Sequence, residues 1–521
     1  MRAAGTVSAL TFVSRILGLV REQVFAMLLG AGDYADALNT AFRVPNLLRD
    51  LFAEGALSSA FVPTYARELA QGGTARAHQL SSRLLSILCV ILGGFVVLGF
   101  AFAGPFVRAL APGFGSVPGK LETTVALARV MLPCLPLVAF AAVTMGMLNA
   151  QEKFAVPAAA PATFNLVAIG WAAVLWAMGF GTAQVAMGWA VGTLLAAAAQ
   201  FLVQVPPLWK EGWRFRPEWA PGDPGIRAIG SLLAPATVGL AAVQVNIFVS
   251  TMFASHEPGA VSWLQYAFRI LYLPIGVFGV AVGTVATTGL ARRAAAGDEK
   301  GLRETLSRSL SLLAFLTIPA TVGLMVLGRP IVRLLFERGR FHAADTENTA
   351  TALALFSIGL VAFTGVKVLA PAFYALGRPR VPLLASASAV AVNLAVIVLL
   401  HARLGYRAIA LGIALGSLLN AAILVGAFER HVGGLLDRRL AAGLLRMTIA
   451  AGLMGPAAWL SARAIESRLG THGLAAQVIG GLGPVVLGVL VYFGASRLLR
   501  LGEARALTAV LGGWVAGNGA R

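Results

Sequence analysis

Apolar runs long enough to cross a bilayer recur along almost the whole chain, and they leave few alternatives to a helical membrane fold. A helix needs about 20 predominantly apolar residues to span the hydrocarbon core. We predict about 14 spans, near 6–30, 35–66, 84–104, 123–150, 156–178, 184–208, 228–253, 261–290, 309–328, 347–376, 381–401, 406–428, 441–462 and 474–496. Hydrophobic residues make up 58% of the 521 residues, charged residues make up 12%, and the mean hydropathy is +0.81. A soluble globule could not cover so much apolar surface, so we predict an all-α polytopic membrane protein.

An even number of spans places both termini on one side of the membrane. The loops on that side carry most of the Lys and Arg residues, so the positive-inside rule predicts cytoplasmic termini. The first span carries charges directly after residues 1–5, so no cleavable signal peptide is expected. The loop after the ninth span is an exception, because it places four arginines outside: Arg329, Arg333, Arg338 and Arg340.

An internal repeat divides the first twelve spans into two sets of six. Residues 225 positions apart match in order, including Arg83 with Arg308, Pro105 with Pro330, Arg108 with Arg333 and Pro157 with Pro382. Because an even number of spans separates the copies, they have the same orientation, as in transporters that bind substrate between parallel repeats. We therefore predict an N-terminal lobe at 1–225, a C-terminal lobe at 226–435, and a third part at 436–521 with the last two spans and a cytoplasmic tail.

Charged residues concentrate in the first two spans. They are Arg15, Arg21, Glu22, Asp36, Arg43, Arg49, Asp50 and Glu54. Each ion at membrane depth costs at least about 2.5 kcal/mol, so such residues normally face a bundle interior or a water-filled cavity and serve a function. On a helix, Arg15 and Glu22 share one stripe, whereas Arg21 points away from it. Pro45 should kink the second span and re-aim Arg49.

Two structural interpretations compete with a functional one for these charges. A cytoplasmic amphipathic hairpin would place them on a solvated face, but apolar residues occupy every face of residues 6–30. Internal ion pairs, such as Arg15 with Glu22, would only hold helices together, and we expect this role for some of the residues.

Other functional classes find little support in the sequence. The net charge of +19 is spread over short loops, which favours anionic lipid headgroups over nucleic acid. Cys89 and Cys134 lie within spans and are expected to be apolar packing residues, without a disulfide or a metal. An integral membrane enzyme would need a positioned acid, base or metal ligand, and no carboxylate pair faces the histidines. We predict a transporter without a cofactor; the six histidines lie in or beside loops, at His78, His256, His342, His401, His431 and His472.

Five segments carry a resemblance to a known family. They are SRILGLVRE at 14–22, DALNTAFRVPNLLRDLFAEGALSSAFVP at 36–63, LPIGVFGVAVGT at 273–284, LLFERGRF at 334–341 and AFYALGRPRVP at 372–382. These segments resemble the MurJ/MviN family of bacterial lipid II flippases, part of a larger group of multidrug, oligosaccharide-lipid and polysaccharide exporters. The resemblance implies transport of lipid II, an undecaprenyl diphosphate carrying a disaccharide-pentapeptide, to the outer leaflet of the bacterial inner membrane. Cell-wall synthesis enzymes are possible partners.

Matching motifs imply that four arginines bind this substrate: Arg15, Arg21, Arg49 and Arg269. Their guanidinium groups can replace the hydration of a diphosphate with bidentate, charge-assisted hydrogen bonds. We expect gating or pairing roles for Asp36, Glu22, Glu54 and Arg43. Some family members carry an acidic residue linked to a sodium site where this chain has Ser250, so no metal site is predicted. An exporter of drugs or of another polyprenyl-linked sugar, and a passive scaffold for wall synthesis, remain alternatives.

Overall fold

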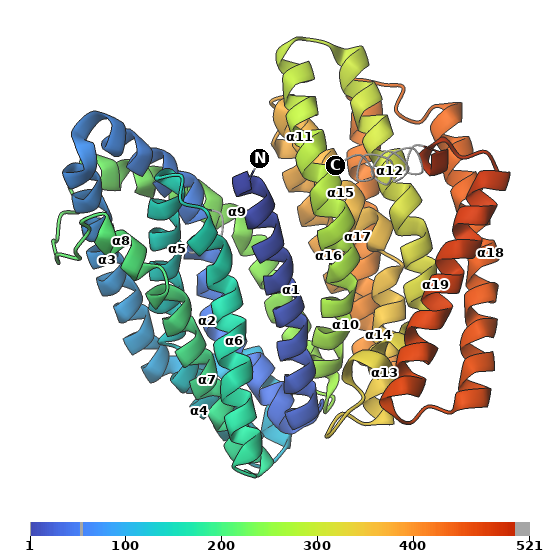
Figure 1. The fold of residues 1–521 in the computed structure, drawn as a ribbon, viewed down its shortest axis with the longest axis horizontal. Helices are drawn as coiled ribbons and strands as arrows, with labels where there is room; N and C mark the ends of the chain where they lie inside the picture. The colour runs from blue at the N-terminus through green and yellow to red at the C-terminus, as the bar shows by residue number, and fades with distance from the viewer. Residues whose placement is uncertain (1, 53–55, 506–521) are drawn as a thin grey trace. The chain divides into compact units, whose positions relative to one another are not determined.

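The computed structural model describes residues 2–52 and 56–505, and every regular element in these ranges is a helix (Figure 1). Ten of the helices in this described part are long and apolar enough to cross a membrane, or eleven if α14 and α15, bent by 43°, count as one span. The predicted all-α polytopic membrane fold is therefore confirmed. The predicted spans near 6–30, 35–66 and 228–253 correspond to α1, to α2 with the start of α3, and to α9.

The chain forms two compact units. The first extends from the N-terminus to Ser262 and includes Arg338–His342. It contains α1 (Arg2–Leu29), α2 (Asp33–Phe52), α3 (Ala56–Leu110), η1 (Pro112–Ser116), α4 (Lys120–Met131), α5 (Cys134–Ala150), α6 (Ala155–Ala177), α7 (Thr182–Leu202), α8 (Val205–Lys210) and α9 (Pro224–Ala254), and it ends inside α10 (Ala260–Pro274). The second unit contains the rest of α10, then η2 (Ile275–Gly279), α11 (Val280–Ala295), α12 (Glu299–Val326), α13 (Gly328–Phe336), α14 (Ala343–Ser357), α15 (Leu360–Ala375), α16 (Arg380–Leu404), α17 (Tyr406–His431), α18 (Arg438–Leu469) and α19 (Leu474–Leu498).

These units are defined by packing and differ from the repeat-based division. Helix α9, which begins the predicted C-terminal lobe, packs against α2 and α3 and belongs to the first unit. The sequence repeat defines the predicted division into 1–225, 226–435 and 436–521. Because the compact units are defined by packing, this division stays a prediction.

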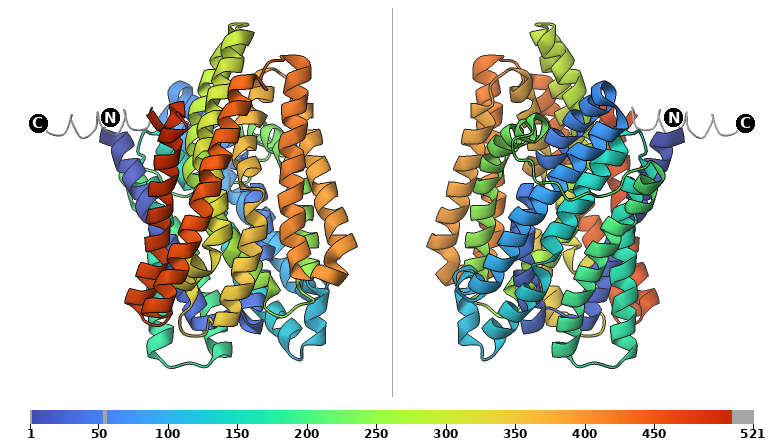
Figure 2. Two further views of the ribbon diagram at one scale, coloured as in Figure 1. Left: turned by 90° about the vertical axis from the view of Figure 1, so that its right-hand side faces the viewer. Right: turned by 90° about the vertical axis from the view of Figure 1, so that its left-hand side faces the viewer.

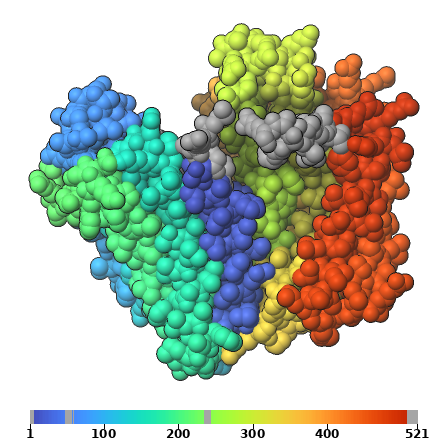
Figure 3. Space-filling model, viewed as in Figure 1, coloured from blue at the N-terminus to red at the C-terminus, as the bar shows by residue number. Residues whose placement is uncertain are grey.

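Within the first unit, α1 packs on α6, α6 packs on α7, and α3 packs on both α5 and α9. Large apolar side chains from α3 fill the centre, including fully buried Phe61 and Tyr65. Figure 3 shows α1 as a surface strip beside α6, and its Phe12, Val13 and Ile16 are exposed. In a membrane, these apolar side chains are suited to contact lipid.

Helix α3 is interrupted at Gly73, where φ is +72° and ψ is 179°. Glycine adopts positive φ without the Cβ penalty of other residues, so the chain turns there at little cost. The predicted second span at 35–66 therefore consists of α2 and the first part of α3. We expected a loop between 66 and 84, but this region is helical on both sides of the break.

In the second unit, α18 and α19 lie side by side (Figure 2). Gly488 lies at this interface, where an added Cβ would be in ordinary van der Waals contact with Met454 Cγ at 3.4 Å. At Gly481, a Cβ would meet Leu334 Cδ2 of α13 at 2.8 Å. Glycines of α19 thus lie where neighbouring helices approach closely.

Two of the four arginines that break the positive-inside pattern are held in ion pairs of the second unit. Arg329 pairs with Glu347, and Arg333 pairs with Glu466 and with Glu337, the last at 3.5 Å. Carboxylates therefore offset two of the four positive charges of this loop locally.

Candidate functional site

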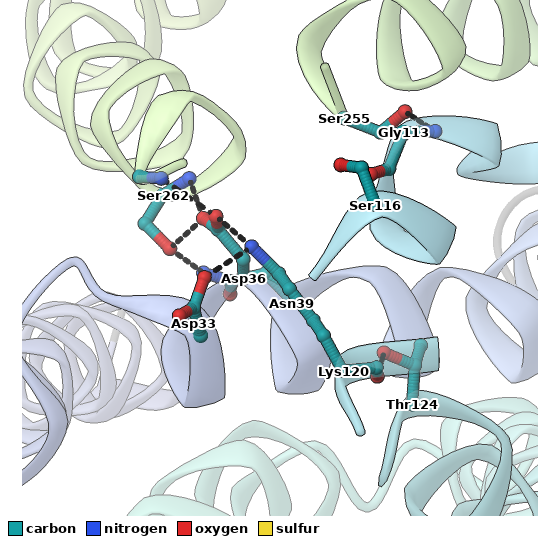
Figure 4. A network of polar contacts seen from close by, with 10 residues as sticks. Asp33, Asp36, Asn39, Gly113, Ser116, Lys120, Thr124, Ser255 and Ser262 are labelled. Atoms are coloured by element: carbon teal, nitrogen blue, oxygen red, sulfur yellow. Dashed lines mark hydrogen bonds and ion pairs between the residues drawn. The ribbon is translucent and has the colours of Figure 1, made fainter. Parts of the chain in front are cut away.

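Asp36, in the first turn of α2, is the centre of a buried polar network in the first unit (Figure 4). Its side chain is 0% exposed, and each oxygen accepts two hydrogen bonds. Oδ1 accepts from the backbone N–H of Ser262 at 3.0 Å and from its Oγ at 2.8 Å. Oδ2 accepts from the backbone N–H of Gly259 at 2.8 Å and from Lys120 Nζ at 2.9 Å.

Lys120, the first residue of α4, is the cation of this network. Its side chain is 2% exposed, and its Nζ also contacts Asp33 Oδ1 at 2.7 Å. The ammonium lies 4.2 Å from the ring centroid of Phe114, within reach of a cation–π interaction. A buried lysine is tolerated only when it is paired in this way, because a lone charge would lose its hydration without compensation.

The network also completes a helix terminus. Gly259 and Ser262 lie at the start of α10, where the first backbone N–H groups have no partner within the helix. The Asp36 carboxylate satisfies two of these donors from another helix and places a negative charge at the positive end of the α10 dipole. Asn39, one turn along α2, adds a hydrogen bond from its Nδ2 to Ser262 Oγ at 3.1 Å.

Two glycines bring further loops of the first unit against this region. A Cβ at Gly113 of η1 would lie 2.4 Å from the carbonyl oxygen of Ser255. The Gly113 N–H donates a hydrogen bond to the Ser255 hydroxyl oxygen, Oγ, at 3.0 Å. A Cβ at Gly339 would lie 2.3 Å from the carbonyl oxygen of Met27, and φ at Gly339 is +59°. The neighbouring Arg340 donates its backbone N–H to the same Met27 oxygen at 3.0 Å. All these loops belong to the side of the membrane predicted to be outside.

The structure changes one predicted ion pair on α1. Glu22 pairs with its neighbour Arg21, at 2.6 Å between Oε1 and Nη2, instead of with Arg15. The long Arg21 side chain bends toward Glu22, and its guanidinium lies 5.4 Å from the centroid of the Phe164 ring. Arg15 is exposed and makes no ion pair or hydrogen bond within the described part of the chain.

The other predicted residues lie in different environments. Arg43 of α2 donates from Nη1 to Thr251 Oγ1 of α9 at 2.6 Å. Arg269 is exposed on α10 in the second unit, beside Phe268. Glu54 lies outside the described residues, and so does the side chain of Arg49. Among the residues that are described, no group of three or more His, Cys, Asp or Glu side chains is arranged to hold a metal ion.

Sequence reasoning missed Lys120, Gly259 and Ser262. Lys120 lies just before the predicted fourth span and was not singled out, although Asp33 and Asp36 have the i, i+3 spacing that lets one cation contact both. The backbone donors of α10 could not be foreseen, because they depend on tertiary packing between helices that are distant in sequence.

The apolar helices, with a buried ion pair and several arginines among them, define a polytopic membrane protein. A family model described as lipid II flippase MurJ matches residues 25–479. The probable lipid II flippase MurJ of Vibrio cholerae is 33% identical, over 96% of this chain and 97% of that protein. The corresponding protein of Rhizobium tropici is 36% identical, over 94% of this chain and 92% of that protein. The chain therefore belongs to the MurJ family and is a transporter, not an enzyme, as its sequence motifs predicted.

Solved structures show the same fold. A lipid II flippase MurJ in an inward closed conformation matches with a TM-score of 0.77 at 24% identity, over 94% of this chain and 98% of that one. An inward-facing multidrug resistance MATE family transporter matches with a TM-score of 0.67 at 15% identity, over 82% of this chain and 94% of that one. At these identities the likeness establishes architecture alone.

Proposed function

We propose that this protein moves lipid II from the cytoplasmic to the outer leaflet of the bacterial inner membrane by alternating access. The family match over residues 25–479 supports the substrate, since the curated relatives are named as lipid II flippases. The observation that supports the mechanism is the buried Asp36 network, because it closes several loops together with bonds that can be broken and remade.

In this proposal, four arginines bind the diphosphate: Arg15, Arg21, Arg49 and Arg269. Arg15 supports it as an exposed guanidinium on a membrane helix with no protein partner in the described part, which an anion can bind directly. Arg21 is held by Glu22, so the substrate must compete with this carboxylate or share the guanidinium with it. Glu22 would then weaken binding of the substrate and help its release.

Asp36 acts in this proposal as an outer gate and not as a substrate ligand. A carboxylate repels a diphosphate, and its four accepted hydrogen bonds leave no free capacity for a sugar hydroxyl. Opening the outer side requires breaking these bonds, and hydrogen bonds to charged groups contribute about 1.5–3 kcal/mol each. The network therefore sets the fraction of molecules whose outer side is closed.

The substrate is tested by reconstituting the purified protein in liposomes and measuring flipping of lipid II against that of a polyprenyl-linked surface-glycan precursor. Faster flipping of lipid II is expected. Equal or preferred transport of the glycan precursor would instead favour the alternative, an exporter of another polyprenyl-linked sugar.

The proposed orientation places both termini in the cytoplasm, and with them the turn between α11 and α12. A single cysteine at Gly297 in this turn should be protected from an impermeant thiol reagent in intact cells and become reactive after permeabilisation. Efficient labelling in intact cells would contradict the proposed orientation and also the assignment of Asp36 to the outer side.

A further inference from the structure

A cavity lined by charged residues lies between α3 and α4 in the first unit. Its volume is about 260 Å³, far more than the ~10–15 Å³ that one water molecule needs. It is lined by Gly104, Arg108, Leu121, Glu122, Val125, Ala126 and Arg129. None of these residues belongs to the Asp36 network or to the proposed substrate-binding arginines.

Three charged side chains face this cavity with few protein partners. Arg129 donates from Nε to the carbonyl oxygen of Phe100 at 3.2 Å, which fixes the guanidinium against α3. Arg108 and Glu122 make no ion pair or hydrogen bond within the described residues. Two guanidinium groups and one carboxylate thus line a single space without neutralising one another.

The position of Arg129 along α4 makes a purely structural role expensive. It lies nine residues after Lys120, which corresponds to roughly 13.5 Å along a helix that rises 1.5 Å per residue. If α4 enters the membrane from the outer side, as proposed, Arg129 lies well below the surface. Ionised residues at such depth usually mark a ligand or a pathway.

The side of α3 next to the cavity offers an apolar surface. Val97, two turns before Gly104 on the same face of the helix, is 70% exposed, and Phe100, one turn before Gly104, is also exposed. These side chains are suited to contact acyl chains, so the cavity combines a charged pocket with an adjoining hydrocarbon-facing strip. This combination is the pattern that an amphipathic lipid requires.

We propose that this cavity binds the headgroup of an outer-leaflet phospholipid that carries a phosphodiester and an ammonium group, as in a phosphoethanolamine lipid. Arg108 and Arg129 bind the phosphate oxygens, because guanidinium donors match them in geometry and charge. Glu122 accepts from the ammonium group, and the acyl chains lie along α3. This lipid is a bulk membrane component and is distinct from the transported substrate.

Native mass spectrometry of the full-length protein tests the proposal. The protein is incubated with phosphatidylethanolamine or phosphatidylglycerol of identical acyl chains, and in a third arm with inorganic phosphate as a competitor. Three variants remove one charge each: Arg108→Gln, Arg129→Gln and Glu122→Gln. Arg308→Gln is the control, since the Arg308 side chain is 85% exposed on α12 in the second unit.

Either arginine variant should lower the retention of both lipids by about tenfold, the value of one charge-assisted hydrogen bond. Glu122→Gln should reduce retention of phosphatidylethanolamine alone. A change no larger than that of Arg308→Gln in the two arginine variants would overturn the site. An equal effect of Glu122→Gln on both lipids would overturn the ammonium contact, and displacement by millimolar phosphate would show a free-anion site and not a lipid site.

The variant Gly104→Leu tests the space in the cavity separately from the charges that line it. Gly104 lines the cavity and a Cβ there would meet no atom within 4 Å, so a larger side chain at this position can extend into the space. The variant keeps all three charged residues and should still lose the lipid. Undiminished retention in Gly104→Leu would place the bound lipid elsewhere on the protein.

Discussion

Asp36 and Lys120 form a buried ion pair, 2.9 Å apart, that joins the start of α2 to the start of α4. The two residues are 84 positions apart in sequence, and each is bonded to further groups. Lys120 also contacts Asp33, and Asp36 also holds the first turn of α10. A change at either residue is therefore expected to act on the helices that they join, with little direct effect on substrate.

Asp36→Asn should impair turnover more than substrate binding. Asparagine can accept fewer of the four hydrogen bonds, and it leaves the Lys120 ammonium with Asp33 as its carboxylate partner. The conformation that is closed on the outer side should become less stable. Opening of that side would then no longer depend on bound substrate. Lipid II affinity and the flipping rate per bound lipid are measured separately on purified protein in liposomes.

Asp33→Asn is the matched control, because the Asp33 side chain is 47% exposed and contributes one contact to Lys120. Its effect should be smaller. Weaker lipid II binding by Asp36→Asn with an unchanged rate per bound lipid would instead identify Asp36 as a substrate ligand.

A double-mutant cycle measures the pair itself. Lys120→Met removes the cation and leaves the carboxylate buried, a change that typically costs about 3–5 kcal/mol. Combining it with Asp36→Asn removes both charges, so the double variant should be less destabilised than the sum of the single variants. The expected coupling is about 0.5–3 kcal/mol, measured by thermal unfolding of the purified protein. Additive effects would mean that the two charges do not stabilise each other in the folded protein.

Gly339→Ala should destabilise the protein more than an ordinary glycine substitution. The new Cβ would lie 2.3 Å from the Met27 carbonyl oxygen, and the residue has a φ of +59°. Gly297→Ala is the control, since Gly297 has a φ of +66° but no atom within 4 Å of the added Cβ. The control therefore carries the backbone strain, roughly 1–2 kcal/mol, without the clash. Equal melting temperatures for the two variants would show that the contact between Gly339 and Met27 is not required.

Hydropathy predicted the spans because the hydrocarbon core admits few alternatives to apolar helices. Local rules were less successful where side chains choose between neighbours. The helical stripe suggested Arg15 as the partner of Glu22, but the flexible Arg21 side chain pairs with it instead. A pairing role was predicted for Asp36, yet its partner Lys120 could not be identified, because a contact across 84 positions depends on how α2 and α4 pack.

Arg269 provides the last test, because its proposed role as a substrate ligand came from motif matching and from the repeat. Arg269 matches Arg43 in the shared AFR tripeptide, but Arg43 is bonded to Thr251 within the first unit, whereas Arg269 is exposed on α10. Because the residue is exposed, an anionic ligand can reach it. Arg269→Ala should abolish transport in a strain depleted of its own flippase, at matched membrane levels of the protein.

Arg269→Lys separates charge from geometry. Lysine retains the positive charge but lacks the planar pair of donors that can bind a phosphate group bidentately, so partial activity is expected. Arg292→Ala, at an exposed arginine in the last turn of α11, is the control for loss of a surface charge and should remain active. Full complementation by Arg269→Ala would remove Arg269 from the proposed substrate site. If Arg269→Lys is fully active and Arg269→Ala is inactive, transport requires the positive charge at this position but not a bidentate contact.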